Sequence, residues 1–282
     1  MRSRFSLIAV ALCAGLLAAG CSGGDSGEPD DSDDAASSTP TTSQPPPPPP
    51  PAPKNGRCYE LSERQLEAAH VDADPVDCAQ GHTAQTYLVG KLRGDVVRSS
   101  DTVDSTAIST TVDQRCATAF GPHIGGDAAV RTLARVRYVW FVPSEEEFNR
   151  GANWFRCDVV TDREHGTPAQ LPASTKGLLD AEDALDTWGT CDQTDGELNA
   201  ESDWRMCAES HNWRAISVLS VGEGDTPWPG AAALQDRAGE CETDVRSYLG
   251  DSTGALEFQW SYPTEQQWRA GRRYGLCWTE DS

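Results

Sequence analysis

The sequence predicts an α+β fold with two tandem homologous small domains, each an antiparallel sheet with helices packed on one side and held by disulfide bonds. Three observations lead to this expectation. Eight cysteines form two sets of four, a 15-residue motif appears twice without a gap, and short aromatic and β-branched runs alternate with helix-capping residues. An antiparallel sheet can face water on one side, so it needs helices on the other side only.

The cysteine spacing is the clearest sign of a duplication. The intervals between successive cysteines are 20, 38 and 41 residues in the first set and 16, 34 and 36 in the second. The eight residues are Cys58, Cys78, Cys116, Cys157, Cys191, Cys207, Cys241 and Cys277. In both sets the second cysteine begins the pattern C-A-[QE]-x-H, which places His82 and His211 at equivalent positions.

The longer repeat predicts local structure. Residues 143–157 and 263–277 share the form P-[ST]-E-x-x-[FW]-x-x-G-x-x-[WY]-x-x-C. In the first copy Ser144 is a helix N-cap, Glu147 completes a capping box, and Gly151 ends the helix in the left-handed conformation. The corresponding residues of the second copy are Thr264, Gln267 and Gly271.

Each copy is expected to supply the same elements. The predicted strands are 83–92, 134–142 and 152–160 in the first copy, and 213–221, 256–262 and 272–279 in the second. The predicted long helices are 105–120 and 231–249. Together with the short capped helices, these elements give the two α+β domains.

An export signal precedes the folded part. Two arginines stand before an apolar run over 7–19, which is shorter than the roughly 20 residues that span a bilayer. The pattern L-A-A-G-C that ends at Cys21 resembles the lipobox of bacterial lipoproteins. We therefore expect residues 1–20 to be a lipoprotein signal peptide and Cys21 to be lipidated. The alternative is an ordinary secretory signal cleaved near Ala19, and both place the rest of the chain outside the cytoplasm.

Residues 21–53 are expected to form a disordered tether. They contain six acids, no base and seven consecutive prolines. A segment so poor in apolar residues cannot offset the entropy of ordering, and the prolines form a stiff rod of about 20 Å. The repeat then sets the remaining boundaries: copy 1 at 54–165, an inter-domain linker at 166–187 and copy 2 at 188–282.

The exported location makes the cysteines a disulfide framework. Four cysteines allow three pairings in each copy. We predict that the first pairs with the second and the third with the fourth. The expected bonds are Cys58 to Cys78, Cys116 to Cys157, Cys191 to Cys207 and Cys241 to Cys277.

These motifs resemble the septum formation domain family, which occurs in membrane-anchored or lipidated envelope proteins of actinobacteria. The resemblance covers residues 58–277 as two tandem copies. It implies a place in the cell envelope and a link to assembly of the division septum, and it implies no enzymatic activity. Many members are tethered by a transmembrane helix, whereas this chain is expected to use a lipid at Cys21.

His82 and His211 are candidates for a structural or a binding role. A C-x-x-x-H pair could bind zinc through free thiols, but disulfide formation removes the thiols and no further cluster completes a set of ligands. The other histidines, His70, His123 and His165, have no counterparts in the second copy. We expect no metal and no cofactor, and we expect His82 and His211 to hold the turn into the next strand.

No motif supports catalysis. The chain contains no G-x-S-x-G and no H-E-x-x-H. Asp180, Glu182 and Asp183 could imitate the paired carboxylates of a glycosidase, but they fall in the expected polar linker. We expect no catalytic residues and no enzymatic activity.

Charge and tryptophan content point to the second copy as the binding surface. Residues 54–165 contain 13 bases and 17 acids, whereas residues 166–282 contain 8 bases and 21 acids. A chain with a net charge of -21 repels nucleic acid. Tryptophans near loops could stack on a sugar or anchor a protein, or could simply cover the core. These candidates are Trp188, Trp204, Trp213 and Trp228.

The sequence therefore predicts a non-catalytic lipoprotein on the extracytoplasmic face of the membrane that binds an envelope protein, and the family resemblance implies a role in septum formation. One alternative is a protein that binds cell-wall glycan or peptidoglycan. The other is an envelope hydrolase, which would depend on His82 or His211. The expected partners are the membrane, through the lipid, and a basic or cationic envelope component.

Overall fold

The computed structural model describes residues 47–98, 100, 102–163, 166–198, 204–250 and 254–281. All of these belong to one compact unit, Pro46–Ser282. The expected signal peptide, the lipidation site Cys21, most of the tether and His165 lie outside the described residues. Within the described ranges, no helix is long and apolar enough to cross a membrane.

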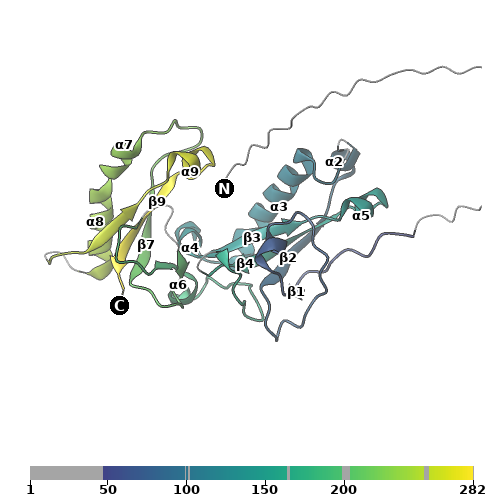
Figure 1. The fold of residues 1–282 in the computed structure, drawn as a ribbon, viewed down its shortest axis with the longest axis horizontal. Coiled ribbons are helices and arrows are strands. Elements are labelled where there is room, and N and C mark those ends of the chain that lie inside the picture. The colour runs from purple at the N-terminus through teal and green to yellow at the C-terminus, as the bar shows by residue number, and fades with distance from the viewer. Residues whose placement is uncertain are drawn as a thin grey trace, which may run out of the picture. The chain divides into compact units, whose positions relative to one another are not determined.

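The first sheet has four antiparallel strands in the order β1-β2-β4-β3 (Figure 1). Its strands are β1 (Cys58–Tyr59), β2 (Ala84–Lys91), β3 (Val136–Phe141) and β4 (Trp154–Thr161). The last three lie inside the predicted ranges or differ from them by one or two residues. The central strand β4 is bonded on both sides, so it fixes the register of the sheet.

The second sheet has five antiparallel strands in the order β6-β5-β7-β9-β8. Its strands are β5 (Thr190–Asp192), β6 (Arg205–Met206), β7 (Trp213–Ser220), β8 (Phe258–Ser261) and β9 (Tyr274–Glu280). Strand β6 has no counterpart in the first sheet. The other four strands, in the order β5-β7-β9-β8, correspond one by one to β1-β2-β4-β3. The two sheets therefore share one topology.

The same irregularity in both sheets strengthens this correspondence. The register shifts between Thr86 and Leu88 in β2, and between Ala215 and Ser217 in β7. Both shifts begin eight residues after the cysteine of the C-A-[QE]-x-H motif. A β-bulge at an identical place in two sheets is expected from a duplication, because bulges are inherited with the strand that carries them.

The helices follow the repeat less closely. They are α1 (Glu63–Leu66), α2 (Gly94–Arg98), α3 (Thr106–Ile124), α4 (Ala128–Leu133), α5 (Glu145–Asn149), α6 (Ala184–Trp188), α7 (Ala231–Gln235), α8 (Ala238–Leu249) and α9 (Glu265–Arg269). The single helix expected over 231–249 is divided into α7 and α8. This break leaves the Leu234 carbonyl able to accept a hydrogen bond of 2.9 Å from the indole of Trp260.

The capped helices form as the repeated motif predicts. The hydroxyls of Ser144 and Thr264 each accept a hydrogen bond from the backbone three residues later, and both capping boxes are complete. Gly151 and Gly271 follow α5 and α9 with φ values of 100° and 99°. This left-handed conformation is one that glycine adopts without steric cost, so both copies end the helix in the same way.

The structure contains four disulfide bonds, and their pairs are those expected from the cysteine order. Two of them connect a strand to the C-A-[QE]-x-H turn of the same copy: Cys58–Cys78 starts from β1, and Cys191–Cys207 starts from β5. The other two connect a long helix to a central strand: Cys116–Cys157 joins α3 to β4, and Cys241–Cys277 joins α8 to β9. The four cysteines of these helix-to-strand bonds are fully buried.

Helices do not occupy one side of the first sheet only. Phe155 and Cys157 of β4 pack in a cluster with residues of α3. Val160 points to the opposite face because side chains alternate along a strand, and there it packs with Leu66 of α1. The expectation of helices on one side is therefore too simple for this sheet.

The segment 166–187, expected to be a linker, contributes to the first core. Leu171, Leu179 and Ala184 are buried in a cluster that includes Val159 of β4. Thr175 donates from both its backbone nitrogen and its hydroxyl to the Gln85 side chain, at 2.7 Å each. The charges of this segment predicted a linker, but its few apolar residues place it in the core.

One cross-strand pair shows how the two sheets diverged. Gly90 of β2 faces Phe155 of β4, whereas Leu219 of β7 faces Gly275 of β9. The large and small residues have exchanged strands. A Cβ atom on Gly275 would lie 2.3 Å from the Trp260 ring and 2.5 Å from the Ser261 carbonyl oxygen, so no larger residue fits there.

We predict that Gly275→Ala lowers the free energy of unfolding by about 1–3 kcal/mol, because the added methyl group overlaps backbone that cannot move away. Gly239→Ala is a matched control: no atom lies within 4 Å of its added Cβ, and it stands in α8. It is expected to raise stability by up to about 1 kcal/mol. Chemical denaturation of both variants measures the difference, and equal effects would contradict this packing.

Candidate functional site

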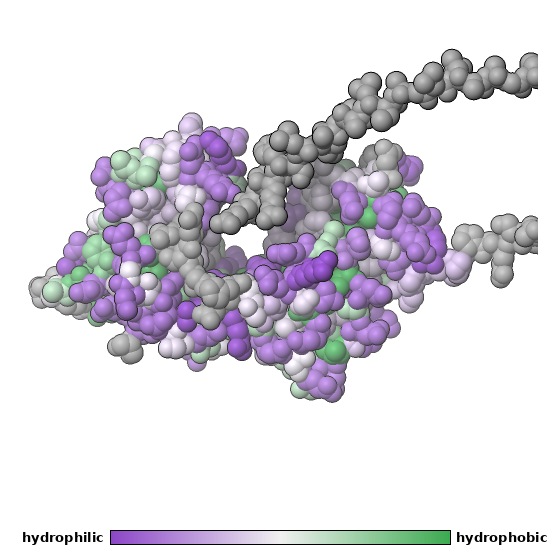
Figure 2. All heavy atoms as spheres, viewed as in Figure 1, coloured by the Kyte–Doolittle hydropathy of each residue, from purple (hydrophilic) through white to green (hydrophobic). Residues whose placement is uncertain are grey.

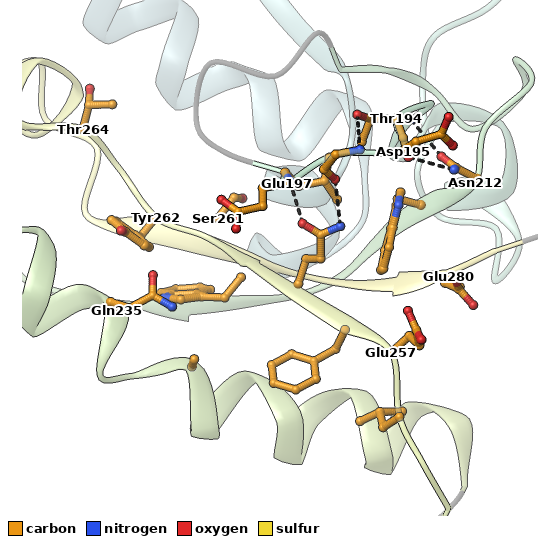
Figure 3. Close-up of a pocket in the computed structure, with 18 residues that line it drawn as sticks. Thr194, Asp195, Glu197, Asn212, Gln235, Glu257, Ser261, Tyr262, Thr264 and Glu280 are labelled. Atoms are coloured by element: carbon orange, nitrogen blue, oxygen red, sulfur yellow. Dashed lines mark hydrogen bonds between the residues drawn. The ribbon is translucent and has the colours of Figure 1, made fainter.

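A cavity of about 1150 Å³ runs along β8, the edge strand of the second sheet (Figure 3). Strand β8 is bonded to β9 on one side and to no other strand within the described part of the chain. Residues from both faces of β8 line the cavity, including Phe258, Gln259 and Trp260. The cavity therefore follows an unpaired strand edge, and we call it the β8 groove.

The rim of the β8 groove is acidic. Asp195, Glu197, Glu257 and Glu280 line it, and all four are exposed. No lysine, arginine or histidine is among the described residues that line it. Figure 3 shows Glu257 and Glu280 close together at one end of the groove. Four of the 21 acids in residues 166–282 therefore lie beside a free strand edge.

Aromatic side chains form the wall beneath this rim. Trp213 and Trp260 line the groove and are each 7% exposed. The ring of Tyr262 lies 6.2 Å from that of Trp260, centroid to centroid. Only a small part of each tryptophan ring is accessible from the groove. An occupant could contact these parts while its backbone lay along the strand edge.

A network of amide hydrogen bonds holds the loop that carries two of the acids. The Leu198 nitrogen donates to Gln259 Oε1 at 2.6 Å, and Gln259 Nε2 donates to the Gly196 carbonyl at 3.3 Å. Asn212 exchanges two further hydrogen bonds with the backbone of Thr194. Because Asp195 and Glu197 lie between these anchors, their positions are set by β8 and by the residue before β7.

The equivalent histidines make the same local contact. His82 Nδ1 donates to the Gln80 carbonyl at 3.0 Å, and His211 Nδ1 donates to the Glu209 carbonyl at 2.7 Å. Each ring therefore closes the turn that leads into β2 or β7. His82 is fully buried, and its Nε2 has no hydrogen-bond partner among the described residues.

His211 has one contact that His82 lacks. Its Nε2 lies 3.2 Å from Asp281 Oδ2. Burial acts to raise the pKa of Asp281, but hydrogen bonds from Arg214 and His211 outweigh it and hold this pKa below its usual value. Asp281 is thus a bound carboxylate at the end of β9, and its charge is already balanced.

One group in the described chain has the composition of a metal site. The sulfur atoms of Cys191 and Cys207 and a ring nitrogen of His211 lie within 4.8 Å of one another. However, the two sulfur atoms form a disulfide bond. A disulfide supplies no thiolate to zinc, so this group does not fit a metal ion in its oxidised form.

The candidate tryptophans are dispersed, and only Trp213 lines the β8 groove. Trp188 packs on the core of the first sheet, Trp204 lies 5.5 Å from Trp278, and Trp228 lies 5.4 Å from Trp268. None of the chain's nine tryptophans, all of which are described, has an exposed side chain. The structure therefore offers no flat, exposed indole of the kind that stacks on a sugar.

Sequence reasoning missed the residues that shape the groove. Neither Trp260 nor any of the four rim acids was among the candidates that the sequence offered. Asp180, by contrast, is engaged in structure, because its Oδ1 accepts a hydrogen bond of 3.0 Å from the Gly126 nitrogen. The charge imbalance was the available signal, but it could not show that acids from three separate segments of the chain meet at one strand edge.

A family model described as septum formation matches residues 53–277. The chain belongs to the septum formation family. One match spans both sheets and all eight cysteines of the disulfide bonds. No curated protein and no solved structure gives a significant match. The family assignment agrees with the resemblance carried by the repeated motifs.

The two sheets differ in the residues beside the helix-to-strand disulfides. Arg156 and Asp158 flank Cys157, whereas Leu276 and Trp278 flank Cys277. Arg156 Nε lies 3.3 Å from Asp158 Oδ2, and both side chains are buried. Burial raises the pKa of Asp158 to about 6, although Arg156 and a hydrogen bond from Thr86 act to lower it.

The second sheet shows that the family fold does not need this ion pair. Leu276 and Trp278 are buried in its place, and the Trp278 indole donates to the Ser261 hydroxyl at 2.8 Å. Apolar residues can replace a buried ion pair without loss of stability. The fold alone therefore does not explain the ion pair in the first sheet.

We predict that His82→Ala lowers the free energy of unfolding by about 2 kcal/mol, because it removes a turn hydrogen bond and leaves a buried void. His211→Ala removes the same bond at a half-buried site and should lower it by about 1 kcal/mol. Denaturant unfolding measures both changes.

His70→Ala is the control, since His70 is exposed and has no counterpart in the second copy. Its effect should stay within about 0.5 kcal/mol. Unchanged stability in His82→Ala and His211→Ala, together with loss of function in cells, would favour a chemical role for these histidines.

Proposed function

We propose that this protein is a non-catalytic lipoprotein on the extracytoplasmic face of the membrane, where it takes part in septum formation by binding a basic segment of an envelope protein. The single observation that carries the binding role is the acidic rim of the β8 groove, which has no base among its described lining residues. Membership of the septum formation family supports a role in division.

The location rests on the sequence and the disulfides together. Four disulfide bonds suit an oxidising compartment. The lipobox-like pattern at Cys21 would hold the protein on the membrane, and the acidic, proline-rich tether would carry it away from the surface. Two tandem domains, equivalent to the two sheets, would then be presented together at the end of this tether.

The mode of binding follows from the unpaired strand edge. An extended segment can add a strand to such an edge, with backbone hydrogen bonds giving affinity and alternate side chains giving specificity. Lysine or arginine side chains of that segment would meet Glu257 and Glu280 at one end and Asp195 and Glu197 on the neighbouring loop. Charge complementarity of this kind sets specificity and speeds encounter.

The rival functions have less support. A glycan-binding protein needs exposed aromatic faces, and every tryptophan is at least half-buried. A hydrolase would need His82 or His211 to act in catalysis, but the His82 ring is fully buried, and both nitrogens of the His211 ring are engaged, by the Glu209 carbonyl and by Asp281. Retention of the protein on purified peptidoglycan would favour the first rival over the proposed binding of a protein segment.

We predict that the double charge reversal Glu257→Lys and Glu280→Lys abolishes enrichment of the full-length protein at division septa, because the basic partner is repelled. Fluorescence imaging of tagged protein in growing cells measures the enrichment. Proximity labelling from the same anchored protein should also lose the labelled partner that carries the basic segment.

The double variant Glu223→Lys and Asp225→Lys is the matched control, since both acids are exposed and neither lines the β8 groove. It has the same net charge as the test variant and should retain septal enrichment. Equal loss in both variants would mean that total charge, rather than the groove, directs the protein. Even distribution of the unaltered protein along the envelope would contradict the septal role.

A further inference from the structure

A second cavity, of about 700 Å³, lies on the first sheet. Its volume falls within the ~300–1,000 Å³ that is typical of sites for small ligands. It is lined by the start of the described chain at 50–54, by the segment 70–75 and by residues around α5 and β4. It shares no residue with the β8 groove, so nothing proposed above uses it.

Arg156 places an unsatisfied charge in the wall of this cavity. Its side chain is only 4% exposed. Its guanidinium carbon lies 3.8 Å from the centre of the Tyr59 ring and 4.7 Å from that of Phe141, so two aromatic rings hold it in place. Nη2 has no hydrogen-bond partner among the described residues. Asp158 balances part of the charge but leaves this donor free.

Arg150 supplies a second unsatisfied donor. It also lines the cavity, and its Nε is buried without a hydrogen-bond partner in the described chain. Its nearest carboxylate contact is Nη1 to Glu146 at 3.9 Å, on an exposed side chain. A buried donor left unpaired costs about 1–3 kcal/mol, and two such donors on one cavity indicate that an acceptor completes them.

The second copy indicates that these arginines are not needed for folding. Ala270 stands before Gly271 where Arg150 stands before Gly151, and Leu276 takes the place of Arg156. Both sheets nevertheless form with the same strand order and the same bulge. The buried Arg156 and the partly buried Arg150 are therefore specific to the first copy, as expected of residues kept for a ligand.

The acids of the cavity limit the kind of anion that fits. Asp72 and Asp74 lie at its exposed side, and Glu147 also lines it. The Glu147 carboxylate is engaged in the α5 capping box, where it accepts from Ser144. Lys54 and Arg57 also line the cavity, so an occupant meets charges of both signs. A ligand with one carboxylate and one ammonium group would satisfy both sides.

We propose that this cavity binds the free carboxylate end of a short zwitterionic peptide or amino acid. The carboxylate would pair with Arg156 and Arg150, since the planar guanidinium fork matches carboxylate geometry. The ammonium group would face Asp72 and Asp74. This site would read a peptide end, whereas the β8 groove would hold an extended segment, so the two copies would contact different ligands.

Isothermal titration of the full chain, purified in detergent, tests the proposal with four probes. The dipeptide L-alanyl-L-alanine should bind. Its C-terminal amide lacks the carboxylate and should bind at least about tenfold more weakly, because charged hydrogen bonds are lost. The N-acetylated dipeptide should also bind more weakly, and inorganic phosphate should not displace the dipeptide.

Two variants assign the binding to the arginines. Arg150→Ala copies Ala270 of the second sheet and should weaken dipeptide binding by about tenfold while the protein stays folded. Arg156→Lys keeps the charge beside Asp158 but loses the planar fork, and should have a similar effect. Arg93→Ala is the control, since Arg93 is exposed and lies outside the cavity. Circular dichroism checks the fold of each variant.

Several results would overturn this site. Equal affinity for the dipeptide and its amide would show that the cavity does not recognise the carboxylate. Tighter binding of phosphate would assign the cavity to phosphorylated ligands instead. Unchanged binding in folded Arg150→Ala, or no binding of any probe, would also reject it. Because these readouts do not depend on the β8 groove, they stand or fall separately from the septal role.

Discussion

The disulfide bond between a long helix and a central strand is the constraint on which both halves of the folded chain depend. Cys116–Cys157 ties α3 to β4, and Cys241–Cys277 ties α8 to β9. Each strand cysteine pairs in register with the residue that resumes the ladder after the bulge, Leu88 in β2 and Ser217 in β7. A small core gains stability when such a bond restricts the unfolded chain, and the residues around it are then free to vary.

The divergence of the two copies follows from this freedom. Beside the disulfide, the first sheet buries a charged pair at Arg156 and Asp158, and the second buries Leu276 and Trp278. At the outer edge, acids gather along β8. Figure 2 shows a surface that is largely hydrophilic, with only small, separate hydrophobic areas on the visible face. Recognition by charge at defined edges and cavities suits such a surface better than broad apolar contact.

Local signals in the sequence predicted most of the strands and helix ends. The capping boxes at Ser144 and Thr264, the stops at Gly151 and Gly271, and six of the strands depend on neighbouring residues, so pattern alone was sufficient. The Leu234 carbonyl near the break between α7 and α8 bonds the distant Trp260 indole, and residues 166–187 are placed by burial of Leu171 and Leu179, so neither feature follows from neighbouring residues. The β8 groove could not be predicted for the same reason, because its rim acids come from three segments that are apart in the chain: the loop after β5, the residue before β8 and the end of β9.

Amide hydrogen exchange tests most directly whether the edge of the second sheet is the binding surface. The full chain would be compared with and without an extended peptide of alternating lysine and valine. Strand addition at the β8 groove predicts slower exchange at Phe258–Ser261, with no change at Val136–Phe141, the equivalent edge of the first sheet. Protection of the first edge instead, or of neither, would contradict the account.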